Sequence, residues 1–393
     1  MDCTNISDKK CTGCGLCKNV CPYDAINMIE NKEGFLFPKI DKSKCQSCGL
    51  CYNICDEVVL KKRGENKPLE VKACQTKNEK WLIESTAGGF FPTLAQWVIE
   101  QGGVVFGTAY DEHMRAVICK ADNVDDILKF NGSKYVQSDL SKAYLDVKNE
   151  LLKKRIVLFS GTPCQNVAIN AFCNGINTDR LITLDIVCYG VPSSGLFRSY
   201  LDTVEFTERK KVVNFRFRDK HKYGWSHTTV ITLEDDNGTK SKIIEEDHSK
   251  IPYYKMFGSR DCFRKSCYCC SYNTIERVTD FTTGNFWGID KMTSDFDTFN
   301  GVSMVLINSM KAQKIFGEIE NCFIVKNMSI QDAIRANDAL IHTCKYPRKR
   351  DKIYKDWHKN GFLEMYKKRY TEKLSSKIIF NLKKYIKILI GRK

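Results

Sequence analysis

The stretch CTGCGLCKNVCP (residues 11–22) carries four cysteines separated by two, two and three residues, and a proline follows the last of them. The stretch CQSCGLCYNIC (residues 45–55) repeats this spacing. Such short spacing lets three thiolates of one run surround one point, while the fourth reaches a second point nearby. Glycines inside both runs let the backbone pass close to sulfur, because glycine has no side chain. The two runs therefore predict a small module with two thiolate-bound metal centres.

This spacing is typical of a bacterial-type dicluster ferredoxin domain with two [4Fe–4S] clusters, which we expect over residues 1–62. One ligand set is Cys11, Cys14, Cys17 and Cys55. The other ligand set is Cys45, Cys48, Cys51 and Cys21. Paired zinc knuckles also contain C-x2-C, but they have no use for the third and fourth cysteine of each run. The segments AINMIE and GFLFPKID between the runs are typical of short strands in such a domain.

The composition indicates a globular protein of two or three domains, since 42% of the 393 residues are hydrophobic and 28% are charged. The chain contains 20 cysteines, and its opening MDCTNISDKK has no apolar signal-peptide core. We therefore expect a cytoplasmic protein whose thiols bind metal and do not form disulfides. No run reaches the roughly 18 apolar residues that a membrane-spanning helix requires.

The net charge of +15 is concentrated at the C-terminus, because residues 345–393 carry 17 Lys or Arg and only four Asp or Glu. We predict a basic amphipathic helical tail over residues 346–393 that attaches to the anionic inner face of the cell membrane. Its expected apolar face is formed by Ile378, Leu382, Tyr385 and Leu389. The alternative is that this face docks on the body of the protein. Nothing in the chain resembles a nucleic-acid readout fold, so nucleic acid is not an expected partner.

Alternating strand and helix patterns run over residues 80–345, after a charged stretch at 63–79 that we expect to be a linker. VVFGTAYD and RIVLFSG are typical of buried strands, and LSKAYLDVKNELLKK of an amphipathic helix. TTVITLEDDNGTKSKIIEED predicts a hairpin that turns at Asn237-Gly238. The chain is therefore expected to be α+β, with the ferredoxin domain fused to a larger α/β domain.

A third group of cysteines belongs to this larger domain. Cys164 and Cys188 follow two predicted strands, whose carboxyl ends form the site edge of an open α/β sheet. RDCFRKSCYCCSYN adds Cys267 and Cys270 at metal-ligand spacing. These four residues form one complete [4Fe–4S] ligand set, although Cys164 and Cys188 also fit the alternative of small core residues.

Six stretches, in family order, resemble the beta-subunit family of coenzyme F420 hydrogenases and dehydrogenases, which also includes 7-hydroxymethyl chlorophyll a reductase. They are STAGGFFPTLA, GSKYVQSDL, FSGTPCQ, VCYGVPSSGLF, FRDKHKYGW and CYCCSYNTIERVTDFTTGNFWGI. The resemblance implies FAD and a [4Fe–4S] centre in the larger domain, with Cys262 and Cys269 as substitutes for the third ligand set. The residues that it implies for the flavin are Gly88, Gly89, Ser133, Lys134, Tyr135, Gln137 and Thr162. No full G-x-G-x-x-G run supports a Rossmann dinucleotide site.

Two departures from the family pattern concern the substrate chemistry. The family's usual Gly-Asp-Phe-Trp-Gly has Asn285 in place of the aspartate, which keeps hydrogen bonds but not charge. Tyr189 stands where a histidine often follows the strand cysteine. The candidate catalytic residues are Asn285, His221 and His227, and a structural role is the alternative for each histidine. Basic neighbours of these histidines fit an anionic substrate, a flavin phosphate or a solvated strand edge.

These observations predict an iron–sulfur flavin-dependent oxidoreductase that moves electrons between a ferredoxin-like carrier and a hydride acceptor or donor. One candidate for that compound is an F420-like coenzyme. The other candidate is a substrate of cell-surface polysaccharide synthesis, because family members with a fused dicluster domain and a basic tail resemble those that accompany such synthesis. The alternative is a non-catalytic electron-transfer subunit that relays electrons to a partner enzyme. The direction of electron flow stays open.

Overall fold

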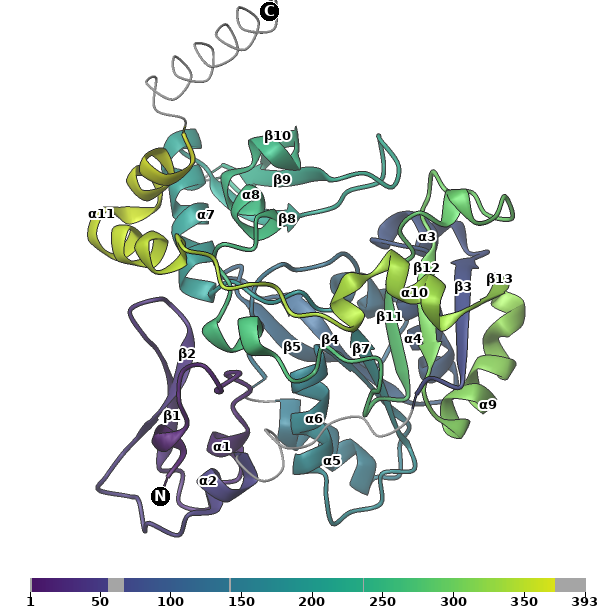
Figure 1. Ribbon diagram of the computed structural model, residues 1–393, viewed down its shortest axis with the longest axis horizontal. Helices are drawn as coiled ribbons and strands as arrows, with labels where there is room; N and C mark the ends of the chain where they lie inside the picture. The colour runs from purple at the N-terminus through teal and green to yellow at the C-terminus, as the bar shows by residue number, and fades with distance from the viewer. Residues whose placement is uncertain (1, 56–66, 141–142, 236, 372–393) are drawn as a thin grey trace, which may run out of the picture.

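The computed structural model describes residues 2–55, 67–140, 143–235 and 237–371 (Figure 1). It confirms the predicted fold class, because a small cysteine-rich module lies against a larger α/β domain. The module comprises a 3-10 turn, two short helices and two strands: η1 (Cys3–Asn5), α1 (Leu16–Asn19), β1 (Ile26–Glu30), β2 (Leu36–Ile40) and α2 (Leu50–Asn53). The two strands pair antiparallel, as the segments between the cysteine runs predict.

An eight-stranded mixed sheet forms the centre of the larger domain, in the order β13-β3-β12-β11-β7-β6-β4-β5. Its strands are β3 (Glu70–Thr76), β4 (Val104–Tyr110), β5 (Ala116–Ala121), β6 (Val157–Gly161), β7 (Leu181–Ile186), β11 (Phe281–Asn285), β12 (Ser303–Ile307) and β13 (Phe323–Met328). Strands β4, β6, β7 and β11 run parallel, and so their carboxyl ends meet at one edge.

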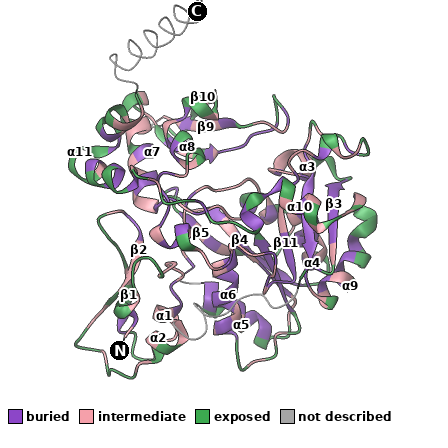
Figure 2. Ribbon diagram, viewed as in Figure 1, coloured by how far each residue is buried: buried purple, intermediate pink, exposed green. Residues whose placement is uncertain are grey.

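Helices cover both faces of this sheet. Successive strand residues point to opposite faces, so Val105 and Leu158 pack towards α4 and α9 while Val104 and Val157 pack towards α5 and α6. The helices of this domain are α3 (Glu79–Glu84), α4 (Phe90–Glu100), α5 (Ala143–Leu152), α6 (Pro163–Phe172), α9 (Met310–Ile319) and α10 (Ile330–Ala336). Figure 2 shows the resulting buried layer along β4, β11, α5 and α6.

Strand β3 lies within residues 63–79, so the linker prediction is wrong for residues 70–76. β3 pairs with both β12 and β13, and the side chains of Ala73 and Cys74 are fully buried. The sequence EVKACQT has few apolar residues and follows a charged stretch, so its pattern did not indicate a strand. Pairing with β12 and β13, which are distant in the sequence, makes it a central strand.

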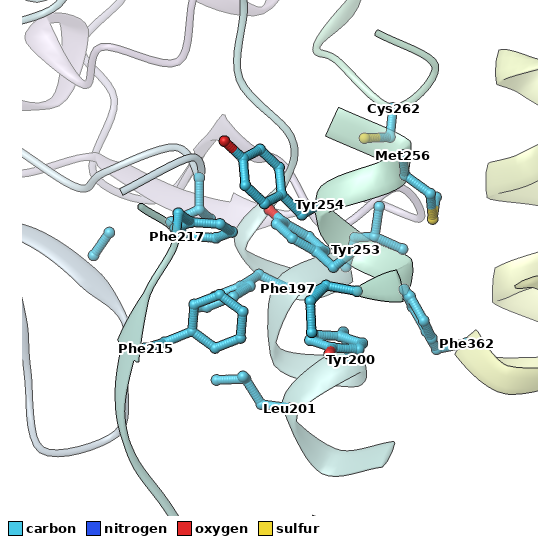
Figure 3. Packing of buried hydrophobic residues seen from close by; sticks show 14 of the residues in the cluster. Phe197, Tyr200, Leu201, Phe215, Phe217, Tyr253, Tyr254, Met256, Cys262 and Phe362 are labelled. Atoms are coloured by element: carbon cyan, nitrogen blue, oxygen red, sulfur yellow. The ribbon is translucent and has the colours of Figure 1, made fainter. Parts of the chain in front are cut away.

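A second, three-stranded antiparallel sheet carries an aromatic core. It contains β8 (Lys211–Arg216), β9 (Thr228–Glu234) and β10 (Lys240–Asp247), and the last two form the predicted hairpin. Its packing partners are α7 (Ser194–Glu208), α8 (Pro252–Gly258) and α11 (Arg350–Tyr370). Figure 3 shows how Phe197, Tyr200 and Phe362 meet there, with the rings of Tyr200 and Phe362 5.1 Å apart.

Helix α11 shows that the first half of the predicted basic tail packs on the protein. Its buried residues, which include Ile353 and Met365, join the aromatic core. The predicted apolar face at residues 378–389 lies outside the described residues. None of the helices in the described part of the chain has the length and apolarity needed to cross a membrane.

Candidate functional site

The cysteines of the module gather in two sets. A small hollow is lined by Cys21, Cys45, Cys48 and Cys51, which form one predicted ligand set. In this set the backbone N–H of Ala25 donates to Cys21 Sγ (3.4 Å). Gly15 and Gly49 precede α1 and α2 with φ of +74° and +75°, a conformation that favours glycine. The two cysteine runs therefore enter their helices by the same turn, as their equal spacing predicts.

The other predicted set of the module faces the larger domain. Burial, with smaller effects of the charges of Cys11 and Cys164, raises the pKa of Cys14 to about 11, and Cys14 and Cys164 line the same cavity. The Tyr144 hydroxyl on α5 donates to Cys14 O (2.6 Å). Burial and the charges of Cys164, Cys14, Cys270 and Cys55 raise the pKa of Tyr272, which lines the same cavity as the first three of these cysteines.

A cavity of about 630 Å³ opens where the parallel strands end. Its lining includes Cys164, Cys188, Cys267 and Cys270, together with Cys14 of the module. Cys164 follows β6 in the first turn of α6, where Pro163 fits because its missing N–H needs no partner. Thr162 caps α6 and contacts Cys164 Sγ with its hydroxyl (3.2 Å). Cys188 follows β7, and the 3-10 turn η5 (Lys265–Cys269) carries Cys267.

The electrostatics of these cavity cysteines favour a bound group that contains metal cations. Burial raises the pKa of Cys164 to about 11, and the charge of Cys270 adds to the effect. Burial and the charges of its three neighbours also raise the pKa of Cys188. A thiol binds metal only after it loses its proton, so iron ions bound here would stabilise the thiolate forms of Cys164 and Cys188. Within the described ranges, no three His, Cys, Asp or Glu side chains are placed to hold a single metal ion.

The two substitute ligands lie elsewhere. Cys262 is fully buried in the aromatic core, and exposed Cys269 points its thiol at Lys9 O (3.0 Å). Neither residue lines the cavity. The structure thus brings together the four cysteines of the predicted set and separates the two substitutes from them.

Arg277 adds a buried positive charge beside these cysteines, and the sequence pattern did not single it out. Its side chain is 3% exposed and lies 3.6 Å from the carboxylate of Asp185. It donates to Tyr272 O (3.1 Å), while its Nε and Nη2 have no hydrogen-bond partner. A [4Fe–4S] cluster with four thiolates carries about two negative charges, so these free donors fit such a group.

The residues expected to bind flavin line the same cavity, with one exception. The cavity lining includes Gly89, Ser133, Lys134, Tyr135, Gln137 and Thr162. Gly88 does not line the cavity. It lies against the sheet instead, where a Cβ atom would collide with the backbone of Cys74 on β3 and of Ser303 on β12. Gly88 thus serves the packing of α4 and its entry turn against the sheet.

Several of these residues already make hydrogen bonds within the protein, among them Ser133, whose hydroxyl bonds that of Thr86 (3.2 Å). Lys134 Nζ donates to the carbonyl oxygens of Lys129 (3.0 Å) and Asn131 (2.9 Å), and burial lowers its pKa to about 7. Gln137 Nε2 donates to Thr12 O of the module (2.9 Å).

Polar atoms without partners line the same region and were also missed from the sequence. They are Ser85 Oγ, both polar atoms of the Asn131 amide and Arg218 Nη2. A buried polar atom without a partner costs free energy, and a polar ligand in the cavity would supply the missing hydrogen bonds. This lining therefore fits a large, polar cofactor such as FAD.

The lining of the cavity also includes two of the three candidate catalytic residues, Asn285 and His227. Asn285 Oδ1 accepts a hydrogen bond from Trp225 Nε1 (2.9 Å), and the Trp225 ring stacks on Trp287 at 4.7 Å. His227 stacks on Trp287 at 5.5 Å, and partial burial with the charge of Arg218 lowers the pKa of His227 to about 4. The neutral imidazole can accept a proton only at acidic pH.

His221 lies outside the lining of the cavity. Its Nδ1 faces the Asp219 carboxylate (3.0 Å) and its Nε2 faces Glu84 (3.4 Å), while about half of its side chain is exposed. The histidine spacing in the sequence did not reveal this difference, because the chain turns sharply between the two residues.

Two thiolate-rich sets in a ferredoxin-like module, adjoining a cavity with four more cysteines, define an iron–sulfur electron-transfer protein. Comparison with family models agrees with this class. The family described as the C terminus of the coenzyme F420 hydrogenase/dehydrogenase beta subunit matches residues 154–332, and the 4Fe-4S dicluster domain matches residues 10–58. Residues 154–332 therefore carry the C-terminal part of this beta-subunit family, and a 4Fe-4S dicluster domain precedes them.

The comparison with solved structures found a similar chain in the F420-reducing [NiFe] hydrogenase complex from Methanosarcina barkeri, a structure that concerns its xenon derivatization. The sequences are 16% identical, the TM-score is 0.46, and the match covers 75% of this chain and 91% of that chain. No curated protein matches this sequence.

Proposed function

We propose that this protein is an iron–sulfur flavin-dependent oxidoreductase with FAD in the cavity and a third [4Fe–4S] cluster at its cysteine end. The observation that carries the proposal is the continuity of one cavity from Cys14 of the module, through four further cysteines, to the unpartnered polar atoms of Ser85, Asn131 and Arg218. Clusters of this kind transfer single electrons, and a flavin transfers two as hydride.

The residues of the chain have separable roles in this proposal. Ser85 and Asn131 would hydrogen-bond the bound cofactor, and Arg218 would neutralise a phosphate or an anionic substrate. Arg277 would compensate the negative charge of the third cluster. Apolar side chains such as Phe91, and the stacked rings of Tyr135 and Phe257, exclude water from the cavity.

The ferredoxin module supplies the outer end of the proposed electron-transfer route. Cys48, in the set remote from the cavity, is exposed, while Cys14 of the other set lies beside Cys164. A ferredoxin-like carrier would therefore exchange electrons at the exposed set. At the other end of the electron-transfer route, the hydride acceptor or donor is an F420-like coenzyme or a substrate of cell-surface polysaccharide synthesis.

A second candidate is a relay subunit without hydride chemistry. It is favoured by the engagement of Asn285 with Trp225 and of His221 with two carboxylates, which leaves His227 as the candidate base at the cavity. A relay of this kind would need the clusters and no flavin.

Measuring iron, acid-labile sulfide and flavin in anaerobically purified protein distinguishes the two candidates. We expect about twelve irons and one FAD in the wild type, and about eight irons in Cys164→Ala. Cys173→Ala is the matched control, because Cys173 is fully buried at the other end of α6 and does not line the cavity. Eight irons in all three proteins with no flavin would refute the oxidoreductase proposal and leave the relay.

A further inference from the structure

Arg264 links the two cysteine-rich parts of the protein. Its backbone belongs to the larger domain, where Arg264 N–H donates to Val191 O (2.9 Å) and Cys267 N–H donates to Arg264 O (3.0 Å). Its side chain is buried and extends into the ferredoxin module. One residue therefore contacts the backbone of a cavity cysteine on one side and the module on the other.

The guanidinium donates to four acceptors across this boundary. Its Nε donates to Cys11 O (2.8 Å) and its Nη2 to Leu36 O (3.0 Å). Nη2 also donates to Cys11 Sγ (3.4 Å), and Nη1 donates to the side-chain oxygen of Gln137 (3.2 Å). The guanidinium lies 4.0 Å from the centre of the Phe37 ring. Its acceptors thus include the sulfur of a predicted cluster ligand.

This positive charge has no acidic partner within the described ranges of the chain, where no carboxylate oxygen lies within 4.0 Å of Arg264. A buried charge is costly unless an opposite charge compensates it. The thiolate of Cys11, and the negatively charged cluster that it binds, supply that opposite charge.

The cysteine run is shaped to admit the guanidinium. Gly13 has φ of +73°, and a Cβ atom there would lie 2.7 Å from Arg264 Nη1 and 2.6 Å from Gln137 Nε2. Any larger residue would displace these donors. The glycine inside the first cysteine run therefore accommodates Arg264 as well as the turn.

We propose that Arg264 is a positioning residue that holds Cys11 against the larger domain and raises the reduction potential of the cluster that Cys11 ligates. A cluster gains negative charge on reduction, and a cationic donor to its sulfur stabilises that state. The inference rests on the two clusters of the ferredoxin module and is independent of FAD and of the third cluster.

A redox titration followed by electron paramagnetic resonance tests the proposal on the full chain, purified anaerobically with its clusters. In Arg264→Met, the ratio of reduced to oxidised protein at a fixed potential should fall about tenfold for one module cluster, which corresponds to 59 mV for a one-electron couple. The other module cluster should keep its potential. Arg264→Lys keeps the charge but cannot serve four acceptors, so we expect an intermediate shift.

Arg350→Met is the matched control, because Arg350 is also a fully buried arginine that joins the module to the larger domain. It donates to Glu33 (2.7 and 2.9 Å) and to Phe263 O (2.7 Å), and none of these acceptors is a sulfur. Both potentials should stay unchanged in this variant.

Three results would overturn the inference: a wild-type potential in Arg264→Met with full iron content, equal shifts of both module clusters, or the same shift in Arg350→Met. If Arg264→Met does not retain its clusters, Arg264→Lys decides, and an unchanged potential there is a refutation. Absence of flavin would refute the proposed oxidoreductase without affecting this test.

Discussion

The ion pair between Arg350 on α11 and Glu33 in the β1–β2 turn should be a major contribution to docking of the ferredoxin module. Arg350 is fully buried, and its two terminal nitrogens bind both oxygens of Glu33 at 2.7 and 2.9 Å. Breaking a buried pair costs about 3–5 kcal/mol when one charge is left uncompensated, whereas Arg350 keeps a second pair with the exposed carboxylate of Asp351 (3.1 Å). The Glu33 side chain is 19% exposed, so water can replace part of this interaction. We therefore expect Glu33→Gln to lower the free energy of unfolding by about 2 kcal/mol.

Urea denaturation of the anaerobic holoprotein measures this effect. Cluster absorbance reports on the module and tryptophan fluorescence on the larger domain. Combining Glu33→Gln with Arg350→Met should cost less than the sum of the single variants, because the double variant leaves no unpaired buried charge. Lys250→Met is the control, since it removes an exposed pair with Glu246 that should contribute little. A midpoint shift for Glu33→Gln no larger than that of the control would refute the reasoning.

Three further outcomes test other parts of the structure. Gly88→Ala should destabilise the protein by about 1–3 kcal/mol, because the added Cβ meets backbone atoms. Gly317→Ala is the control for a thermal melt and should be neutral or stabilising, because the space at its Cβ is open. Equal melting temperatures of the two variants would contradict the packing role of Gly88. Burial lowers the pKa of Lys220 to about 7. Between pH 7 and 10 the unfolded chain therefore binds more protons than the folded protein, and the free energy of unfolding rises with pH. Lys220→Met should lose this rise, and an unchanged pH profile in the variant would count against the burial effect. Alkylation of the holoprotein followed by mass spectrometry should label exposed Cys269 and Cys322 and spare the twelve predicted ligands; labelling of those ligands would argue against bound clusters.

The central strands and the cavity edge were predictable from local pattern. Continuous apolar runs in β4 and β6 reflect their two covered faces, and the cysteines after β6 and β7 lie where parallel strands end. Strand β3 was not predictable, because a short apolar run beside charged residues becomes a central strand only when β12 and β13 pair with it.

The sequence by itself predicts the ligand sets of the module, because the spacing of a cysteine run restricts which thiolates can meet at one cluster. It also determined that Cys164 and Cys188 reach the same sheet edge. The tertiary structure alone decided the contacts of Arg264 and Arg277, since their partners Cys11 and Asp185 are separated from them by many residues along the chain. It also separated His221 from His227. Local spacing encodes contacts within a few residues, whereas burial and charge compensation depend on which distant segments the fold brings together.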